Sequence, residues 1–470
     1  MVHRSTRGVT LRAAPLLALL LVAACGDDEE LLSGPRYDVR EFDTASDDFE
    51  KQMEAGGPAT DQPPPTPNTV TPITPYGVTG ETRALSLPVQ VANANWTQIN
   101  GGPTHQITHP ALPNQLSLAW SVPIGEGNTL RKRITADPVV SGGLIFTMDS
   151  NSMVQAHTTQ GQLVWQTDLT PTVERPGEAV GGGLAVEGSQ LFVTTGYGAL
   201  FALNVATGAQ NWVQSLGSMP NSAPTVSGNI VYLTTRDSTA WAIDTRNGRV
   251  LWDLLASESG TVVVDGAAPA VTSRAVLFPF GSGDLVAALK VGGVRLWSTT
   301  VTGQRRGKAY AGIGDISSDP VVVGDTVYVG TPSGRLAAIN AADGDRLWTA
   351  PFGASSAVWP AGGSLFLVSD QANLVRVAAS TGEPIWSASL PLFTDEKIKK
   401  RKAVFTHYGP VLAGGRLIVV SDDGYMREID PTSGALLRMS ELPGAAAANP
   451  IVAGRTLYVV TADGTLSAFR

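Results

Sequence analysis

A repeated tryptophan segment constrains the fold of this chain more than any other feature. Three copies are nearly alike, each with a glycine four residues before the tryptophan: 202–212, 242–252 and 338–348. The other copies are looser and end at Trp120, Trp165, Trp297, Trp386 and, in degenerate form, Arg438. The marks are 38 to 52 residues apart. This period suits one four-stranded blade, so eight marks predict an all-β, eight-bladed β-propeller.

Each repeat also carries the local signals of antiparallel strands. A proline opens most units, as at Pro138 and Pro320, where its missing N–H costs no ladder hydrogen bond because the strand begins after it. In one unit the polar turn 331–334 joins two apolar runs, which is typical of a hairpin. One blade cannot bury both of its faces, so we expect the blades to stack with tryptophans wedged between neighbours.

The two ends of the repeat region complement each other. Residues 464–469 copy inner and middle strands but stop before any tryptophan strand, whereas residues 116–120 supply a tryptophan strand without an inner partner. We therefore expect both ends to share one blade, which closes the ring and removes exposed strand edges.

The N-terminus has the layout of an export signal. Residues 1–24 contain three arginines and no acid, then an apolar run too short to span a bilayer, then small residues before Cys25. Residues 22–25 resemble a lipobox, so we expect a signal peptide at 1–24 and a lipid anchor on Cys25. An ordinary signal peptide with a chance cysteine is the alternative. Because Cys25 is the only cysteine, no intramolecular disulfide can form.

Residues 25–85 predict a flexible tether ahead of a propeller at 86–470. Residues 26–70 hold twelve acidic and three basic residues, a net charge of −9, while the whole chain carries −8. A stretch rich in proline and threonine follows, and the segment has too few apolar residues for a core. The acidic balance argues against nucleic acid or an anionic bilayer as the main partner.

The repeats from about Trp96 to Arg470 resemble the pyrroloquinoline-quinone (PQQ) type of propeller repeat. Together with the lipobox, they resemble the BamB family, lipoproteins of the outer-membrane β-barrel assembly machinery. This resemblance implies a non-enzymatic scaffold without a cofactor, anchored to the outer membrane and facing the periplasm. It also implies binding to the polypeptide-transport-associated domains of BamA, and help with inserting nascent outer-membrane proteins. Gly26 after the cysteine agrees with export to the outer membrane.

In that family, partner contacts cluster on loops of two adjacent central blades. Alignment on Pro320 places Asp315 on an acidic position of the family and Ser317 where a second acid is frequent. The resemblance therefore implies that Asp315 and Ser317 belong to the partner-binding surface.

A second loop aligns less completely. Alignment on Pro269 places Val263 and Val264 where the family has an apolar residue followed by arginine. Since that arginine is missing, either Arg305, Arg306 or Lys308 replaces its charge, or the contact of this chain differs.

Two other functions are considered. A quinoprotein dehydrogenase uses the same repeats, but it needs adjacent cysteines above the quinone and a calcium site, and this chain has one cysteine. A lipid-anchored propeller that binds another envelope component shares every feature except the family resemblance.

Three further groups of residues have both a structural and a functional interpretation. His105 and His109 have metal-ligand spacing, but the surrounding prolines favour a solvent or packing role. The basic run 397–402 is interpreted as a solvated loop, with docking on an acidic partner or on the acidic tether as the alternative. Residues 131–133 and 305–306 would extend such a basic rim.

Overall fold

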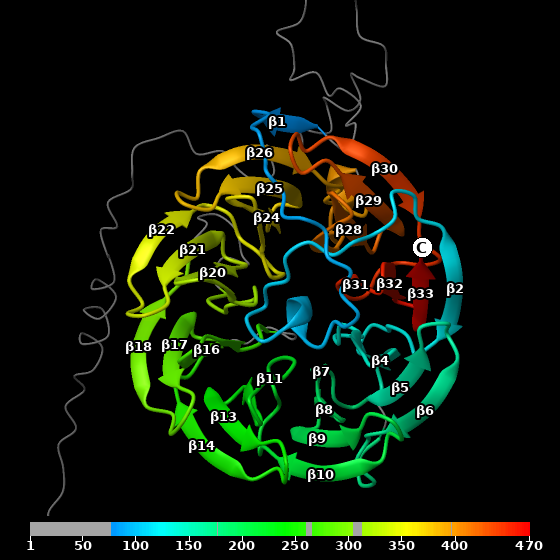
Figure 1. Cartoon of the computed structure of the whole chain (residues 1–470), viewed down its shortest axis with the longest axis vertical. Coiled ribbons are helices and arrows are strands. Elements are labelled where there is room, and N and C mark those ends of the chain that lie inside the picture. The colour runs from blue at the N-terminus through cyan, green and yellow to red at the C-terminus, as the bar shows by residue number, and fades with distance from the viewer. Residues whose placement is uncertain (1–76, 176, 260–265, 304–312, 396) are drawn as a thin grey trace, which may run out of the picture. The chain divides into compact units, whose positions relative to one another are not determined.

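The computed structural model describes residues 77–175, 177–259, 266–303, 313–395 and 397–470. Eight four-stranded antiparallel sheets stand around a central axis, as Figure 1 shows, which confirms the predicted all-β, eight-bladed propeller. The export signal, Cys25, Val263, Val264, Arg305 and Arg306 lie outside the described residues. In the described ranges, no helix has the length and apolar character needed to cross a membrane.

The blades are numbered here in chain order, each from its innermost to its outermost strand. Blades 1 to 4 consist of β3 (Val139–Ser141), β4 (Leu144–Met148), β5 (Met153–Thr158) and β6 (Leu163–Asp168); β7 (Gly182–Glu187), β8 (Gln190–Thr195), β9 (Ala199–Asn204) and β10 (Gln210–Ser215); β11 (Thr225–Ser227), β12 (Ile230–Thr234), β13 (Thr239–Asp244) and β14 (Val250–Leu255); and β15 (Ala270–Val271), β16 (Ala275–Pro279), β17 (Asp284–Leu289) and β18 (Arg295–Thr300).

Blades 5 to 8 consist of β19 (Val321–Val323), β20 (Thr326–Thr331), β21 (Arg335–Asn340) and β22 (Arg346–Ala350); β23 (Trp359–Ala361), β24 (Ser364–Val368), β25 (Asn373–Ala378) and β26 (Pro384–Ser389); β27 (His407–Ala413), β28 (Arg416–Ser421), β29 (Tyr425–Ile429) and β30 (Leu436–Glu441); and β31 (Ile451–Ala453), β32 (Thr456–Thr461), β33 (Thr465–Phe469) and β2 (Leu118–Pro123). Blade 6 carries β1 (Val78–Gly80) as a fifth strand, and two short 3-10 turns complete the list, η1 (Ile99–Gly101) and η3 (Ile398–Lys400).

Blade 8 joins the two ends of the ring. Strand β2 pairs antiparallel with β33, with Trp120 opposite Ala468 and Val122 opposite Leu466. The prediction that both ends share a blade is therefore confirmed. The closure leaves no blade without its fourth strand, although the strands come from opposite ends of the repeat region.

Tryptophans of one blade pack against the next blade, as the sequence predicted. The indole of Trp297 in blade 4 donates a hydrogen bond to the carbonyl of Ala341 in blade 5 at 3.1 Å. Its ring lies against Gly344, where a Cβ would come within 2.6 Å of Cε3. The same two contacts recur at Trp120, Trp165, Trp212, Trp252, Trp348 and Trp386. The recurring glycine thus makes room for the ring of the preceding blade.

The eighth blade boundary replaces the tryptophan by an arginine. Arg438 of blade 7 donates from Nη1 to the carbonyl of Asn114 at 3.3 Å and to Glu428 Oε1 at 3.3 Å. The guanidinium therefore bonds to the chain just before β2, the outermost strand of blade 8, and to a strand of its own blade.

One segment that does not belong to any repeat fills the centre of the ring. Residues 83–117, called here the central segment, cross one face of the ring and carry η1 at its middle, as Figure 1 shows in blue. The segment hydrogen-bonds to all eight blades, which it meets in the order 6, 8, 1, 2, 3, 4, 5 and 7. In blade 6 the bond comes from Arg376 of β25 rather than from the innermost strand.

Most of these bonds reach the same place in the blades. The backbone groups of valines in the inner strands of six blades hydrogen-bond to the central segment: Val140, Val186, Val226, Val271, Val322 and Val452. Their partners in the segment are backbone groups, except at Val226 and Val452, which bond to the side chains of Gln98 and Asn93. In blade 6 the equivalent residue is Pro360, which has no N–H to donate. An inner strand would otherwise present unpaired backbone groups to the channel, so the central segment satisfies them and closes this end.

Candidate functional site

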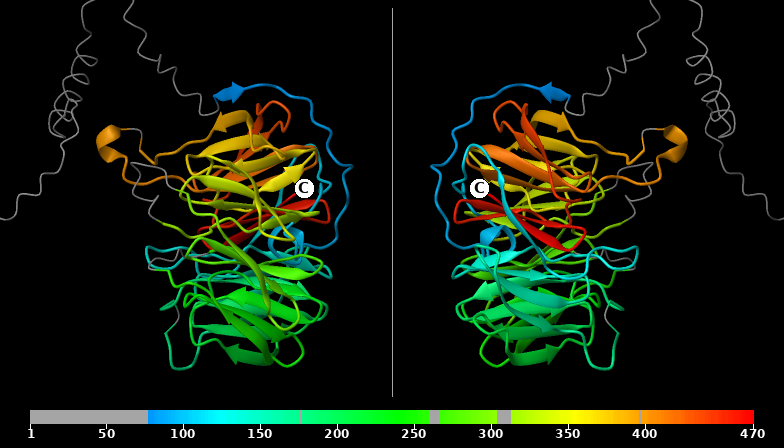
Figure 2. Two further views of the ribbon diagram at one scale, coloured as in Figure 1. Left: turned by 90° about the vertical axis from the view of Figure 1, so that its left-hand side faces the viewer. Right: turned by 90° about the vertical axis from the view of Figure 1, so that its right-hand side faces the viewer.

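The two faces of the ring differ in what they leave open. One face, called here the closed face, is covered by the central segment. The opposite face, called here the connection face, carries the loops that lead from one blade to the next. Figure 2 shows the blue central segment on one side and the orange loop around η3 projecting on the other. The cavities described below are lined by residues of these connecting loops, which makes the connection face the candidate functional surface.

A small polar cavity marks the channel on the connection face. It has a volume of about 40 Å³ and is lined by Ile99 of η1 and by Asp137, Asp319 and Asn449. Asn449 donates its backbone N–H to Asp137 Oδ1 at 2.8 Å, and Ala268 donates its own to Asp319 Oδ1 at 2.7 Å. Burial, only partly offset by these bonds, raises the pKa of Asp319 to about 7 and that of Asp137 to about 6. The channel thus holds two carboxyls that titrate near neutral pH.

Both histidines singled out in the sequence are buried packing residues. The Nδ1 atom of His105 lies 2.9 Å from the carbonyl of Pro320 in blade 5, and burial lowers the pKa of this imidazole to about 4. His109 contacts the carbonyl of Pro88 at 2.7 Å and accepts the N–H of Gly415 in blade 7 at 2.9 Å. Within the described ranges, no three His, Cys, Asp or Glu side chains are grouped to hold a metal ion.

A larger, apolar cavity lies between blades 5, 6 and 7. It has a volume of about 530 Å³, and its apolar lining includes Val368, Leu392, Phe393, Val404 and Phe405. The loop that joins β26 to β27 forms one wall, where Phe393 and Val404 face each other in an isolated antiparallel bridge. We call this cavity, with the exposed cations of the same loop, the basic-rimmed groove. The cations are Lys397, Lys399, Lys400, Arg401 and Lys402.

The loop itself is an ordered turn rather than an irregular excursion. The Lys400 N–H donates to the Lys397 carbonyl at 2.7 Å, and the guanidinium of Arg401 lies 4.9 Å from the centre of the Phe393 ring. The side chains of Lys400 and Asp395 are 4.0 Å apart, but both are substantially exposed, so this pair contributes little stability. The exposed cations fit the solvated loop that the sequence predicted.

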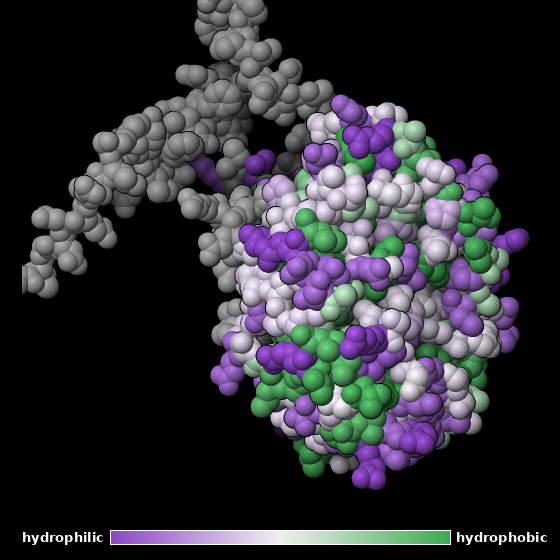
Figure 3. Space-filling model, turned by 60° about the vertical axis from the view of Figure 1, so that its left-hand side comes forward, coloured by the Kyte–Doolittle hydropathy of each residue, from purple (hydrophilic) through white to green (hydrophobic). Residues whose placement is uncertain are grey.

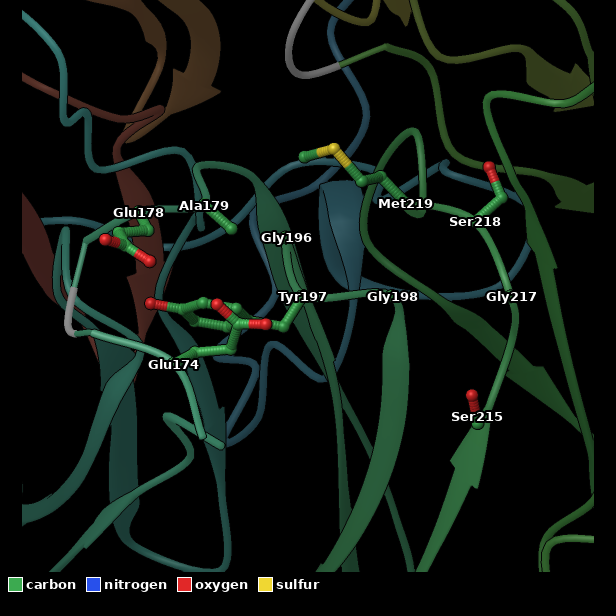
Figure 4. Close-up of a pocket in the computed structure, with 10 residues that line it drawn as sticks. All are labelled: Glu174, Glu178, Ala179, Gly196, Tyr197, Gly198, Ser215, Gly217, Ser218 and Met219. Atoms are coloured by element: carbon green, nitrogen blue, oxygen red, sulfur yellow. The ribbon is translucent and has the colours of Figure 1, made fainter. Parts of the chain in front are cut away.

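A third cavity, of about 360 Å³, lies beside blade 2. Figure 4 shows Glu174 and Glu178 of the preceding loop near Tyr197, with Met219 across the opening. The Tyr197 hydroxyl donates to the Arg175 carbonyl at 2.7 Å and so fixes the loop against the blade. This cavity is acidic at its entrance, in contrast to the basic-rimmed groove.

Exposed apolar side chains also gather on the outer rim. Figure 3 shows hydrophobic residues (green) collected on the lower part of the molecule. Strand β14 carries three of the exposed apolar residues, Val250, Leu251 and Leu255. From Leu251 to Leu255 exposed residues alternate with the less exposed Trp252 and Leu254, as expected for an outermost strand.

The two described residues of the expected partner-binding surface lie beneath the connection face. The loop before β19 carries both, and Asp315 is 3% exposed and Ser317 8% exposed. The Ser317 hydroxyl donates to the Ala354 carbonyl at 2.8 Å, which links this loop to the next one. The chain leaves β14 of blade 3 and β18 of blade 4 on the same face, and Val263, Val264, Arg305 and Arg306 lie outside the described residues.

The central segment is the functional element that the sequence analysis missed. Its residues fall in the ranges expected to form the tether and the propeller, and they show no repeat and no strand alternation that would set them apart. One signal was Trp96, which falls outside the tryptophan marks of the repeat. Trp96 stacks on Trp359 with ring centres 6.3 Å apart, which places both tryptophans in the core.

Comparison with known proteins identifies relatives over most of the repeat region. The family model described as outer membrane protein assembly factor BamB matches residues 150–388 and 393–470. The BamB of Yersinia pestis is 24% identical over 373 residues, covering 77% of this chain and 91% of that protein. The BamB of Burkholderia pseudomallei is 26% identical over 363 residues, covering 75% and 87%.

Solved structures share the fold. The crystal structure of BamB from Moraxella catarrhalis has a TM-score of 0.63 and 22% identity, covering 76% of this chain and all of that one. A europium-containing methanol dehydrogenase has a TM-score of 0.62 at 14% identity, covering 80% and 98%. At these identities the structural likeness shows the propeller fold alone.

The residues of the channel do not fit the quinone of the dehydrogenases. The polar cavity of about 40 Å³ has room for a few water molecules, and Ile99 is among the residues that line it. The single cysteine of the sequence also leaves no adjacent pair to cover a quinone. We therefore derive no chemistry through this cofactor.

Proposed function

Because the chain belongs to the family of outer membrane protein assembly factor BamB, we propose that it aids the insertion of outer-membrane proteins by binding, without catalysis. The observation that carries this proposal is the family match across residues 150–388 and 393–470, which spans most of the ring. The small cavity in the channel supports a binding role, since it offers little room for a substrate.

The proposed location follows from the N-terminal sequence. A lipid on Cys25 anchors the chain to the outer membrane, and the propeller faces the periplasm. Two or more acyl chains on one residue give a stable attachment, because each buried methylene contributes about 0.8 kcal/mol. The acidic residues 26–70 then form the link between the anchor and the ring.

The proposed partner is BamA, bound through its polypeptide-transport-associated domains. The contact surface is formed by the connection-face loops 256–268 and 301–320, which contain Val263, Val264, Arg305 and Arg306. Asp315 and Ser317 lie below that surface, so they act on the contact by fixing the second loop. We assign the contact to the connection face because the central segment covers the opposite one.

An affinity pulldown from detergent-solubilised envelopes tests this function. The tagged full chain should recover BamA, and Val263→Asp combined with Val264→Asp should reduce the recovery, because two carboxylates enter an apolar contact. The matched control is Val291→Asp combined with Val294→Asp. These valines are 82% and 59% exposed in the turn between β17 and β18.

Equal loss in both double variants would show a general effect of added carboxylates, and undiminished recovery with Val263→Asp and Val264→Asp would assign the contact to another surface. Recovery of a different envelope component in place of BamA would replace the proposed function by that of another lipid-anchored binding propeller.

A further inference from the structure

The basic-rimmed groove is a hollow of binding-site size with a mostly apolar lining. Its volume of about 530 Å³ falls in the range of about 300–1,000 Å³ that is typical of ligand pockets. Leu392, Phe393 and Phe405 line the groove, and each is only partly buried. Covering such side chains is favourable, because apolar surface then leaves water. The groove therefore favours an occupant that inserts apolar side chains.

The two arms of the basic loop form an ordered ribbon beside this hollow. We call residues 392–394 and 403–405 the stalk. The Thr394 N–H donates to the Ala403 carbonyl at 3.1 Å, and the Phe405 N–H donates to the Leu392 carbonyl at 2.9 Å. Beyond the stalk, the loop around η3 projects from the connection face, as Figure 2 shows in orange. The paired arms therefore hold the cations of residues 397–402 at the rim of the groove.

The foot of the stalk is anchored in blade 7. The Nε2 atom of the buried His407 lies 2.7 Å from the Pro391 carbonyl, and its Nδ1 atom lies 2.6 Å from the Ser421 hydroxyl. The Asp422 carboxylate accepts the Thr406 N–H at 2.8 Å. Both arms are thus tied to β27 and to the end of β28, so this wall of the groove is built into the fold.

The rim of the groove carries an excess of positive charge. Residues 391–406 hold five cations and two acids, a net charge of +3. Burial raises the pKa of Asp422 at the foot of the stalk, and the nearby charge of Arg133 opposes this rise. Arg133 belongs to a second basic run, residues 131–133, in the connection from β2 to β3. A partner with negative charge is attracted to this rim.

A polypeptide matches these two properties better than a lipid surface does. The apolar side chains line a hollow, whereas the cations stand on a projecting loop. A flat bilayer would contact the loop and leave the hollow empty. A polypeptide can insert a side chain into the hollow and place neighbouring carboxylates against the cations.

We propose that the basic-rimmed groove binds a segment of another polypeptide in which large apolar side chains are flanked by carboxylates. The apolar side chains enter the hollow between blades 5, 6 and 7, and the carboxylates face the cations of residues 397–402. Among the described residues, none from the loops proposed to contact BamA lines the groove, so the two surfaces are separate. This inference goes beyond the proposed function and does not depend on it.

Binding of a fluorescent synthetic peptide to the full chain in detergent, measured by anisotropy, tests the proposal. The probe carries two phenylalanines, each flanked by glutamates, and we expect saturable binding. Alanine in place of both phenylalanines, or lysine in place of the glutamates, should weaken binding by about tenfold or more. The first change removes the apolar contact, and the second removes the charge complementarity. High salt should also weaken binding of the original probe.

Two variants of the chain locate the binding site. Lys397→Glu combined with Lys400→Glu and Lys402→Glu should weaken binding of the glutamate peptide by about tenfold or more. The same variant should bind the lysine peptide more tightly than the unmodified chain does, because the rim has changed sign. Val404→Asp places a carboxylate in the lining, at a side chain that is 55% exposed, and should also weaken binding of the glutamate peptide.

Matched controls separate the groove from general effects of charge. Arg249→Glu, Arg274→Glu and Arg455→Glu make the same charge change at exposed positions of the closed face and should leave peptide binding unchanged. Val291→Asp is the control for Val404→Asp, because its side chain is 82% exposed and is not part of the groove lining.

Three results would overturn the proposal. The first is equal loss of binding in the lysine variant and the arginine control, which would show a response to net charge alone. The second is equal affinity for the phenylalanine and alanine peptides. The third is the absence of saturable peptide binding; phosphatidylglycerol vesicles that bind instead, and that the lysine variant releases, would then assign the loop to a lipid surface. None of these results bears on the recovery of BamA, so failure here is distinguishable from failure of the proposed function.

Discussion

The glycine and tryptophan of each repeat act together across a blade boundary. The spacing of these residues was enough to predict the number of blades and the wedging of the tryptophans. The sequence did not show why the glycine recurs, because the ring that requires it belongs to the preceding repeat. At Gly344, both a positive φ of +81° and the Trp297 ring disfavour a side chain.

Substitution of this glycine separates the two effects. Gly344→Ala should lower the free energy of unfolding by about 1–3 kcal/mol more than Gly292→Ala, because only the former places a Cβ against an indole. Gly292 is the matched control, with a φ of +80° and no atom within 4 Å of its would-be Cβ. Denaturant unfolding measures both free energies. Equal losses would show that the backbone strain at a positive φ accounts for the whole effect and that the contact with the indole adds nothing.

The channel carboxyl Asp319 makes stability depend on pH. Burial raises the pKa of Asp319 in the folded protein to about 7, above the 3.8 of an unperturbed aspartate. Its contribution to the free energy of unfolding is therefore complete below about pH 4 and is lost as the pH rises toward 7. Asp319→Asn should therefore gain stability relative to the unmodified protein over this window, by up to about 1.4 kcal/mol per pH unit. Unfolding curves at several pH values measure this gain. A gain that is the same at every pH, or that also appears in the exposed-site control Asp345→Asn, would contradict the assignment.

At the scale of elements, the repeated strands were predictable and the central segment was not. The strands repeat because every blade buries its two faces against neighbouring blades in the same way, and the apolar runs in the sequence reveal these strands. The central segment instead makes a different contact with each blade, mainly through backbone groups, which leave no mark in the sequence. An alignment of loop positions carries no information on burial, so it could not predict that Asp315 and Ser317 are buried.

Gln98 offers a direct test of the central segment. Its side chain donates to the Val226 carbonyl at 2.9 Å and accepts the Val226 N–H at 2.8 Å, so it pairs with β11 as a strand would. Gln98→Ala leaves both buried backbone groups unpaired and should cost about 2–4 kcal/mol. The measurement is urea unfolding, with the exposed Gln210→Ala as control. A loss as small as that of the control would show that the segment only covers the ring.

At the scale of the whole molecule, ring closure through blade 8 followed from the incomplete repeats at the two ends. The sequence did not predict that the closed face and the connection face differ, because this difference depends on the central segment. With one face occupied, the groove, the acidic cavity and the loops proposed to contact BamA all lie on the other face.

The central claim is that this chain aids outer-membrane protein insertion through the connection face. The most direct test is the amount of folded β-barrel protein in outer membranes of cells that lack the chain. We predict a decrease, restored by the unmodified gene and by Val291→Asp with Val294→Asp, but not by Val263→Asp with Val264→Asp when all are equally abundant. Unchanged barrel levels in the deletion strain, or full restoration by the connection-face variant, would contradict the account.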